Sequence, residues 1–351
     1  MGWGKKKNVI GLDIGSSSIK LVELREGKNG FRLQNLAVSS LAPEAIVDGA
    51  LMDSVTIIDT IKDLVTSVTK TREVVTSVSG HSVIVKKITL PFMTETELEE
   101  SIQWEAERHI PFDINDVNID FQILGYGSDN PDMMDVILVA AKKDIINDYV
   151  SMIMEAGLNP VVVDIDAFAL ENMLGINYDI EKDEIVATVN VGASVTNINI
   201  LKNNTSAFTR DVFKGGNQIT EEIQRQLHVD YEEAEKVKVG DKGDSKAQGV
   251  VQEILKTASE SLAMEIGNSL DFFQSTSTYQ KISKLYLSGG GSKIKDFDII
   301  LQQQIGLPVE IANPFRKIEY NEKSFDLEYL RDIGPVMAVG VGLASRKVGD
   351  K

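Results

Sequence analysis

The pattern of hydrophobic and polar positions at the start of the chain predicts an α/β unit. Residues 9–24 contain two apolar runs around a Gly-Ser turn, which indicates a β-hairpin. Residues 30–38 alternate and predict a third strand, residues 54–69 have helical spacing, and residues 74–78 predict a buried strand. The order β-β-β-α-β predicts a first lobe over 8–80.

The next stretch, residues 81–160, predicts a separate inserted module of order β-α-β-β-α. Its first strand stops at Pro91, and Thr94 followed by Glu95 and Glu97 predicts the N-cap and acidic first turn of a helix. The five elements are expected at 81–90, 94–109, 117–124, 135–141 and 144–157. A structural insertion and a platform for docking a partner both fit this pattern.

The opening pattern then recurs about 180 residues later, which indicates an internal duplication. Glu184–Leu201 again has an apolar strand, a polar residue, a glycine with small residues, a threonine and a second apolar strand. The predicted organisation is therefore two lobes. Besides the first lobe and the module, we expect a tail at 1–7 and a stretch at 161–183 that returns to the first lobe and forms a connecting helix. The second lobe is expected at 184–333, with a helical part at 215–282, and a second connecting helix and a tail at 334–351.

Composition narrows the class of protein. The 351 residues carry a formal net charge of −17, so unspecific binding to nucleic acid or to an anionic membrane is not expected. The chain has no cysteine, which excludes disulfides and thiolate metal sites, and its three histidines are far apart in sequence and fit no metal-ligand spacing. No apolar run reaches the ~18 residues of a membrane span, and the N-terminus lacks the apolar core of a signal peptide. A cytoplasmic protein is expected.

The first hairpin carries the candidate chemistry. Gly15, Ser16, Ser17 and Ser18 allow backbone N–H groups to converge on an anion in the turn. Asp13 ends the first strand beside this turn and Lys20 lies early in the second, so a metal-side carboxylate and a phosphate-side cation flank one pocket. This predicts a nucleotide with Mg²⁺, although a plain tight hairpin has the same pattern. No Walker loop or Rossmann fingerprint occurs.

An Asp-x-Gly-Ser hairpin with a lysine seven residues after the aspartate resembles the first phosphate loop of the actin, Hsp70 and sugar-kinase superfamily. Five elements follow the superfamily pattern along the whole chain: 13–20, 164–174, 190–196, 288–292 and 334–345. Within it the chain resembles FtsA and, more closely, the PilM family of type IV pilus assembly proteins. The resemblance rests on Leu90–Met93 with Glu97-Leu98, on Glu105–Phe112, on the lysines before the first strand, and on the absence of an amphipathic helix after residue 346.

The resemblance implies an actin-like ATPase fold of two duplicated lobes with an inserted FtsA-type subdomain, and roles for individual residues. Asp13 and Asn190 would hold Mg²⁺ through water. The residues implied to surround ATP are Gly15, Ser16, Ser17, Ser18 and Lys20 from the first loop, Gly192, Ala193, Ser194 and Thr196 from the second, Gly289, Gly290 and Gly291 under the nucleoside, and Gly216, Glu235 and Lys238 near the ribose and adenine. For Glu235 and Lys238, a solvated ion pair on a helix face is the competing interpretation.

The sequence departs from the superfamily at Asn190, where the second phosphate loop normally begins with aspartate. A neutral amide can hydrogen-bond a metal-bound water but lacks the negative charge that orients the ion and an attacking water. Asp164 is the candidate for positioning water, Asp166 is a weaker one, and both also suit helix capping. We therefore expect ATP binding with slow or negligible turnover.

The resemblance also implies a partner. Proteins of this kind bind the N-terminal cytoplasmic peptide of PilN in a groove between the first lobe and the inserted module, which would hold the protein at the inner membrane without insertion of its own. Contact with the pilus motor ATPases and self-association are compatible with this function. The alternatives are a sugar or acetate kinase of the same superfamily, for which Asp164 is the single candidate carboxylate, and the cytoplasmic domain of a type II secretion protein.

Overall fold

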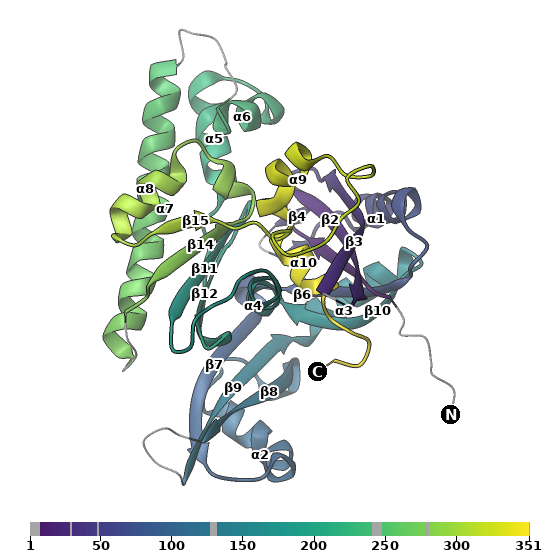
Figure 1. The fold of residues 1–351 in the computed structure, drawn as a ribbon, viewed down its shortest axis with the longest axis vertical. Coiled ribbons are helices and arrows are strands. Elements are labelled where there is room, and N and C mark those ends of the chain that lie inside the picture. Colours follow the sequence, from purple (N-terminus) through teal and green to yellow (C-terminus); the bar gives the residue numbers. More distant parts are fainter. Residues whose placement is uncertain are drawn as a thin grey trace.

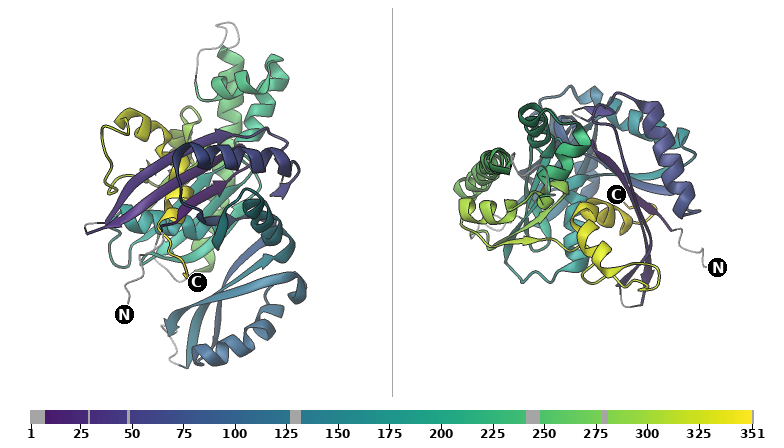
Figure 2. Two further views of the ribbon diagram at one scale, coloured as in Figure 1. Left: turned by 90° about the vertical axis from the view of Figure 1, so that its right-hand side faces the viewer. Right: turned by 90° about the horizontal axis from the view of Figure 1, so that it is seen from above.

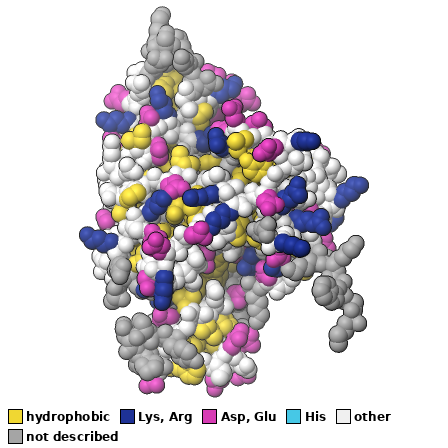
Figure 3. Space-filling view, viewed as in Figure 1, with side chains coloured by type: hydrophobic (Ala, Val, Ile, Leu, Met, Phe, Trp, Pro, Cys, Tyr) yellow, Lys and Arg dark blue, Asp and Glu magenta, His cyan; other side chains and the backbone are white. Residues whose placement is uncertain are grey.

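The structure is a computed structural model that describes residues 8–28, 30–47, 49–126, 132–240, 248–277 and 281–350. The expected tail at 1–7 lies outside the described residues, and so do residues 241–246, whose polar sequence predicts a solvent-exposed loop. The chain forms two lobes around a central pair of helices, α4 and α10, and a smaller module projects from one end (Figure 1; Figure 2, left). On the face drawn in Figure 3, acidic and basic side chains are interspersed.

The first lobe is built on a five-stranded sheet of order β10-β6-β1-β2-β3. Its first three strands form an antiparallel meander, and β6 and β10 pair in parallel beside β1. The elements are β1 Ile10–Ile14, β2 Ser18–Gly27, β3 Gly30–Ser40, β4 Ile46–Val47, β5 Ala50–Leu51, α1 Ser54–Val68, β6 Glu73–Val78, α3 Lys143–Glu155 and β10 Asn159–Ile165. Apolar side chains of α1 and α3 bury one face of this sheet.

The second lobe repeats the design with a sheet of order β13-β12-β11-β14-β15. Helices α5, α7 and α8 contribute apolar side chains to its core. Its elements are β11 Ile185–Val191, β12 Thr196–Lys202, β13 Thr205–Val212, α5 Gly216–Leu227, α6 Tyr231–Lys238, α7 Gln248–Thr276, β14 Lys284–Ser288, α8 Phe297–Ile305 and β15 Val309–Ile311. The repeated hairpin pattern had predicted β11 and β12, but not β13 or β15.

The module consists of a three-stranded antiparallel sheet of order β7-β9-β8 with α2 on one face. Its elements are β7 Val83–Pro91, α2 Glu95–Glu107, β8 Val117–Tyr126 and β9 Met133–Lys142. The predicted N-cap is present: Thr94 Oγ1 accepts from the Glu97 N–H, and the Glu97 carboxylate accepts from the Thr94 N–H. Leu98, Ile102 and Ala106 bury the inner side of this helix.

Helix α3 packs in the first lobe, so the module is smaller than expected. We expected it inside the module, but Tyr149, Met152 and Ile153 are buried in the core of the first lobe. The part that stands apart is therefore 83–142. An amphipathic pattern shows that one helix face is buried, but it does not show which sheet covers that face.

The lobes meet where α4 (Asp166–Asn177) crosses the small-residue helix α10 (Ala338–Ala344). A Cβ atom on Gly342 would lie 1.7 Å from the carbonyl oxygen of Ala169, so this crossing requires glycine. Before α10, helix α9 (Leu327–Ile333), which the pattern had not predicted, leads the chain back from β15. In the described part of the chain, no helix is long and apolar enough to span a membrane.

We expect Gly342→Ala to lower the free energy of unfolding by about 2–3 kcal/mol, because the added methyl group must separate two backbones in contact. Chemical denaturation measures the change. Gly175→Ala in α4 is the matched control, because its methyl group meets open space, and it should be neutral or slightly stabilising. Equal stability of the two variants would contradict the close crossing.

Candidate functional site

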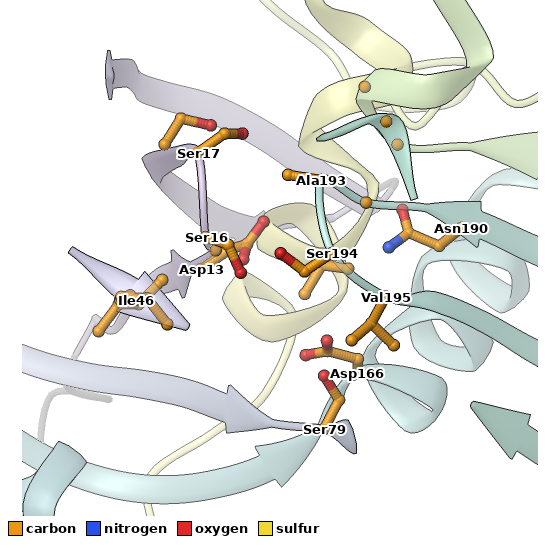
Figure 4. A pocket seen from close by; sticks show the side chains of 18 of the residues that line it. Asp13, Ser16, Ser17, Ile46, Ser79, Asp166, Asn190, Ala193, Ser194 and Val195 are labelled. Atoms are coloured by element: carbon orange, nitrogen blue, oxygen red, sulfur yellow. The ribbon is translucent and has the colours of Figure 1, made fainter. Parts of the chain in front are cut away.

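A cleft between the lobes is lined by residues of both duplicated hairpins (Figure 4). The first lobe contributes the β1–β2 turn and the end of β6, and α4 begins on the floor. The second lobe contributes the β11–β12 turn, the start of α5, the end of α6 and the glycine bend after β14. The two hairpin turns face each other across this space, as the internal repeat suggested.

In the first hairpin, Asp13 and Lys20 lie directly opposite each other on β1 and β2. The Lys20 Nζ is 3.3 Å from the Asp13 carboxylate, and both side chains are largely buried. Burial raises the pKa of Asp13, and the neighbouring ammonium partly offsets that rise. The Gly15 N–H donates to the Ser18 carbonyl at 3.1 Å and closes the turn. Among the described residues, no protein acceptor pairs with the N–H of Ser16 or Ser17.

The second hairpin turn is held against the start of α5. The Gly192 N–H donates to the Val195 carbonyl at 2.9 Å, while the N–H groups of Gly216 and Asn217 donate to the carbonyls of Gly192 and Ala193 at 2.9 and 2.8 Å. A Cβ on Gly192 would lie 2.7 Å from the Val195 oxygen. The first two N–H groups of α5 are thus used by the turn. Among the described residues, no protein acceptor pairs with the N–H of Ala193 or Ser194, and both residues line the cleft, an arrangement that suits an anion.

The glycine bend after β14, Gly289–Gly291, forms a further wall of the cleft. Gly289 has a φ of +84°, which favours glycine, and its Cβ would lie 2.4 Å from the Val191 carbonyl. A Cβ on Gly291 would lie 2.1 Å from the Val191 side chain. Side chains on these residues would therefore displace the bend. Gly289, Gly290 and Gly291 all line the cleft.

Glu235 and Lys238 form an ion pair in which the lysine is buried and the carboxylate is 34% exposed, so the interpretation as a fully solvated pair is wrong. Lys238 is 6% exposed, and its Nζ lies 2.5 Å from the Glu235 carboxylate and 2.8 Å from the Thr220 hydroxyl. Burial lowers the pKa of Lys238, an effect that the carboxylate opposes. Both residues line the cleft next to Gly216.

Of the two candidate aspartates, Asp166 lies in the cleft and Asp164 does not. Asp166 lines the cleft and accepts a hydrogen bond from the Ser77 hydroxyl at 2.6 Å. Asp164 is not among the lining residues; its carboxylate is buried 3.3 Å from the Arg346 guanidinium, and burial raises its pKa against the effect of that charge. The assignment of Asp164 as a water-positioning residue is therefore corrected. The kinase alternative loses its single candidate carboxylate with it.

Thr196 also lies outside the cleft. Its side chain is fully buried and its hydroxyl donates to the Lys214 carbonyl at 2.8 Å. It therefore anchors the segment before α5 and does not contact a ligand in the cleft. The other residues expected around the nucleotide, from Gly15 to Gly291, line the cleft, as do Asp13 and Asn190.

The cleft also contains residues that the sequence analysis missed: Ser77, Ser79, Gly80, Tyr149, Asn197, Asn217 and Tyr231. A signal for three of them was present, because Ser77, Ser79 and Gly80 end a buried parallel strand, where α/β sheets bind ligands. Asn197 occupies the position in β12 that faces Asn190, as Lys20 faces Asp13 in the first hairpin. Tyr149 comes from α3, which we had placed in the module.

These residues fit a nucleotide with a hydrated metal ion. At Gly192, Gly289 and Gly291 a Cβ would clash with the protein, so glycine keeps the two turns of the second lobe in place beside the cleft. N–H groups without a protein acceptor among the described residues, together with serine hydroxyls, suit phosphate oxygens. Among the described residues, no group of three or more His, Cys, Asp or Glu residues could hold a metal directly. The carboxylates of Asp13 and Asp166 are suited to bind Mg²⁺ through its water ligands.

Comparisons with known proteins extend this description. Residues 11–348 match the sequence model of the family described as type IV pilus assembly protein PilM. A structure described as a PilM-PilN type IV pilus biogenesis complex is similar over 99% of this chain and 100% of that chain, with a TM-score of 0.88 and 31% identity.

Two more distant structures share the fold. The ethanolamine utilization protein EutJ from Carboxydothermus hydrogenoformans has a TM-score of 0.58 and 15% identity over 97% of this chain and 89% of its own. MreB5 of Spiroplasma citri, solved with AMPPNP, has a TM-score of 0.52 and 13% identity over 97% and 95%. The expected actin-like α/β fold is confirmed.

Proposed function

The chain belongs to the PilM family of type IV pilus assembly proteins, and from this premise we propose that it binds ATP with Mg²⁺ between its lobes and docks the N-terminal cytoplasmic peptide of a PilN protein. The observation that carries the docking is the likeness over nearly the whole chain to a PilM solved with PilN. Through that peptide, the protein is held at the inner membrane and links the membrane complex to the pilus motor ATPases.

The nucleotide part of the proposal rests on the opposed hairpin turns. Each turn lines the cleft with backbone N–H groups that have no acceptor among the described residues, and Lys20 lies beside the first turn. The relative solved with AMPPNP shares this fold. The polar network of Glu235, Lys238 and Thr220 lies beyond the phosphate turns, where a ribose and base would extend.

Asp13→Ala and Lys20→Ala should each weaken ATP binding by about 1–3 kcal/mol, since each removes a charged group beside the phosphates or their metal. Calorimetry with Mg²⁺ measures the loss, and thermal unfolding verifies that each variant is folded. Lys317→Ala is the matched control, because Lys317 pairs with Asp179 outside the cleft. Unchanged ATP affinity in both cleft variants would place the nucleotide elsewhere.

Slow turnover is the second part of the proposal. Asn190 is 9% exposed at the end of β11 and places a neutral amide where a carboxylate would orient the ion and water. Asp166 is engaged by the Ser77 hydroxyl. If hydrolysis is slow, the bound nucleotide acts mainly by stabilising one arrangement of the two lobes.

We expect the wild-type protein to hydrolyse ATP far more slowly than the ~1 s⁻¹ low end of ordinary enzymes. Release of inorganic phosphate, followed under conditions where calorimetry shows the site to be saturated, gives the rate. A preparation of Asp13→Ala made in parallel measures contaminating ATPase activity. Wild-type hydrolysis at or above that range would refute a mainly structural nucleotide.

Peptide docking is proposed at the module. Strand β8 is the edge of its sheet, on the side opposite β7, and β7 packs near β13 of the second lobe. Ile119 and Phe121 are partly buried against the core beneath α2, and Ile123 on the same strand is 37% exposed. An extended peptide can add main-chain hydrogen bonds at this edge while alternate side chains continue the apolar surface.

Ile123→Glu should weaken the binding of a labelled peptide that copies the N-terminal segment of the cognate PilN at least tenfold, because a charge would replace an apolar side chain beside those of the added strand. Fluorescence anisotropy measures the affinity. Ile299→Glu in α8 is the matched control, being a similarly exposed isoleucine of the second lobe. A point variant is preferable to deletion of the module, because a deletion that reached α3 would remove Tyr149 and Ile153 from the core of the first lobe. Equal affinity of the two variants would exclude docking at β8.

A further inference from the structure

A row of polar side chains crosses the second sheet beneath the cleft. Ser288 on β14 is the register neighbour of Asn190 on β11, which is opposite Asn197 on β12, which is in turn opposite Asp211 on β13. Ser288, Asn190 and Asn197 are 1%, 9% and 2% exposed. The equivalent position of the first hairpin holds a single ion pair, so this row belongs to the second lobe alone.

The row is hydrogen-bonded from end to end, and its donors all run in one direction. Ser288 Oγ donates to Asn190 Oδ1 at 3.2 Å, Asn190 Nδ2 donates to Asn197 Oδ1 at 3.2 Å, and Asn197 Nδ2 donates to Asp211 Oδ1 at 2.9 Å. The other oxygen of Asp211 accepts from the Gly80 N–H of the first lobe at 2.6 Å. Beside this contact, His81 stacks on Phe213 with ring centroids 3.3 Å apart.

Asp211 sets this direction because a carboxylate can only accept. An asparagine amide has a donor end and an acceptor end of nearly equal size, so alone it can adopt either orientation. Asn197 must turn its NH₂ toward Asp211, which leaves its oxygen toward Asn190. Asn190 must then turn its own NH₂ toward Asn197 and its oxygen toward the Ser288 hydroxyl.

We propose that Asp211 is a positioning residue, which orients Asn190 so that an amide N–H, and not an amide oxygen, is available to the nucleotide phosphates. The NH₂ group has two hydrogens, and Asn197 uses one. Asn190 lines the cleft, and Figure 4 shows its nitrogen on the side of Val195. The second hydrogen suits a phosphate oxygen, whereas the sequence alone suggested contact with a metal-bound water. The inference rests on the proposed ATP site.

Because the donors of the row run in one direction, Asn190→Asp should disrupt it and a second substitution at Asp211 should repair it. In Asn190→Asp, a carboxylate faces the Asn197 oxygen, and Asn197 cannot turn without facing the Asp211 carboxylate with its oxygen. One amide between two acceptors leaves one buried contact unsatisfied. Adding Asp211→Asn lets the row reverse: residue 211 can donate to Asn197 Oδ1, Asn197 can donate to the new carboxylate, and residue 211 still accepts from Gly80.

The test compares wild type, Asn190→Asp, Asp211→Asn and the double variant without nucleotide at pH 8, where Asp211 is best ionised despite the burial that raises its pKa. We expect Asn190→Asp to lower the unfolding midpoint by several degrees and Asp211→Asn to restore part of that loss. Asp166→Asn in the Asn190→Asp background is the control, because it removes a nearby charge but lies outside the row. Additive losses, or equal rescue by the control, would overturn the fixed direction.

The phosphate contact is tested by the ATP affinity of wild type and Asp211→Asn, measured with Mg²⁺ and again with EDTA. A weakening of about threefold to tenfold in both conditions is expected, because the lost donor faces a phosphate. A weakening confined to Mg²⁺ would return Asn190 to the metal and overturn the proposal. Wild-type protein that binds no ATP would instead refute the proposed function, while the unfolding midpoints would still test the row.

Discussion

The close approach of α10 to the rest of the molecule is the constraint on which the cleft depends. Gly342 brings this helix onto the backbone of α4, and a Cβ on Gly11 of β1 would lie 2.3 Å from the Gly340 carbonyl. Strand β1 ends at the first phosphate turn, and α4 begins at Asp166 on the cleft floor. Backbone contact at these glycines therefore sets the distance between the groups that face the cleft, which larger side chains would increase.

The two halves of the duplication use the same geometry with different electrostatics. At equivalent positions of the two hairpins, the first lobe has the ion pair of Asp13 and Lys20, and the second has the amides of Asn190 and Asn197. The ion pair places a cation and a carboxylate together in a largely buried site beside the first hairpin turn. A row of amides carries no charge and instead offers oriented hydrogen-bond donors. The two hairpins therefore present different chemistry to the same cleft, charge from the first lobe and oriented amides from the second.

The module is anchored at one end and open at the other. Its sheet has its own core beneath α2, while β7 packs near the second lobe and β8 remains an edge among the described strands. The segment that leads into it, Gly80 and His81, is held to the second lobe through Asp211 and Phe213. The root of the module is therefore tied directly to the second lobe.

The sequence by itself determined most of the elements and their order, although not β13, β15 or α9. Strand alternation, the Thr94 cap and the repeated hairpin follow from local periodicity and turn chemistry, so both phosphate turns and the glycine bend could be located without the structure. Periodicity also shows that one face is buried, as it did for α3. It could not place Asp164 beside Arg346 and Asp166 in the cleft, because two aspartates two residues apart at a strand end have the same local pattern. Tertiary packing decided which acids, threonines and helix faces meet, because those contacts join residues far apart in the chain.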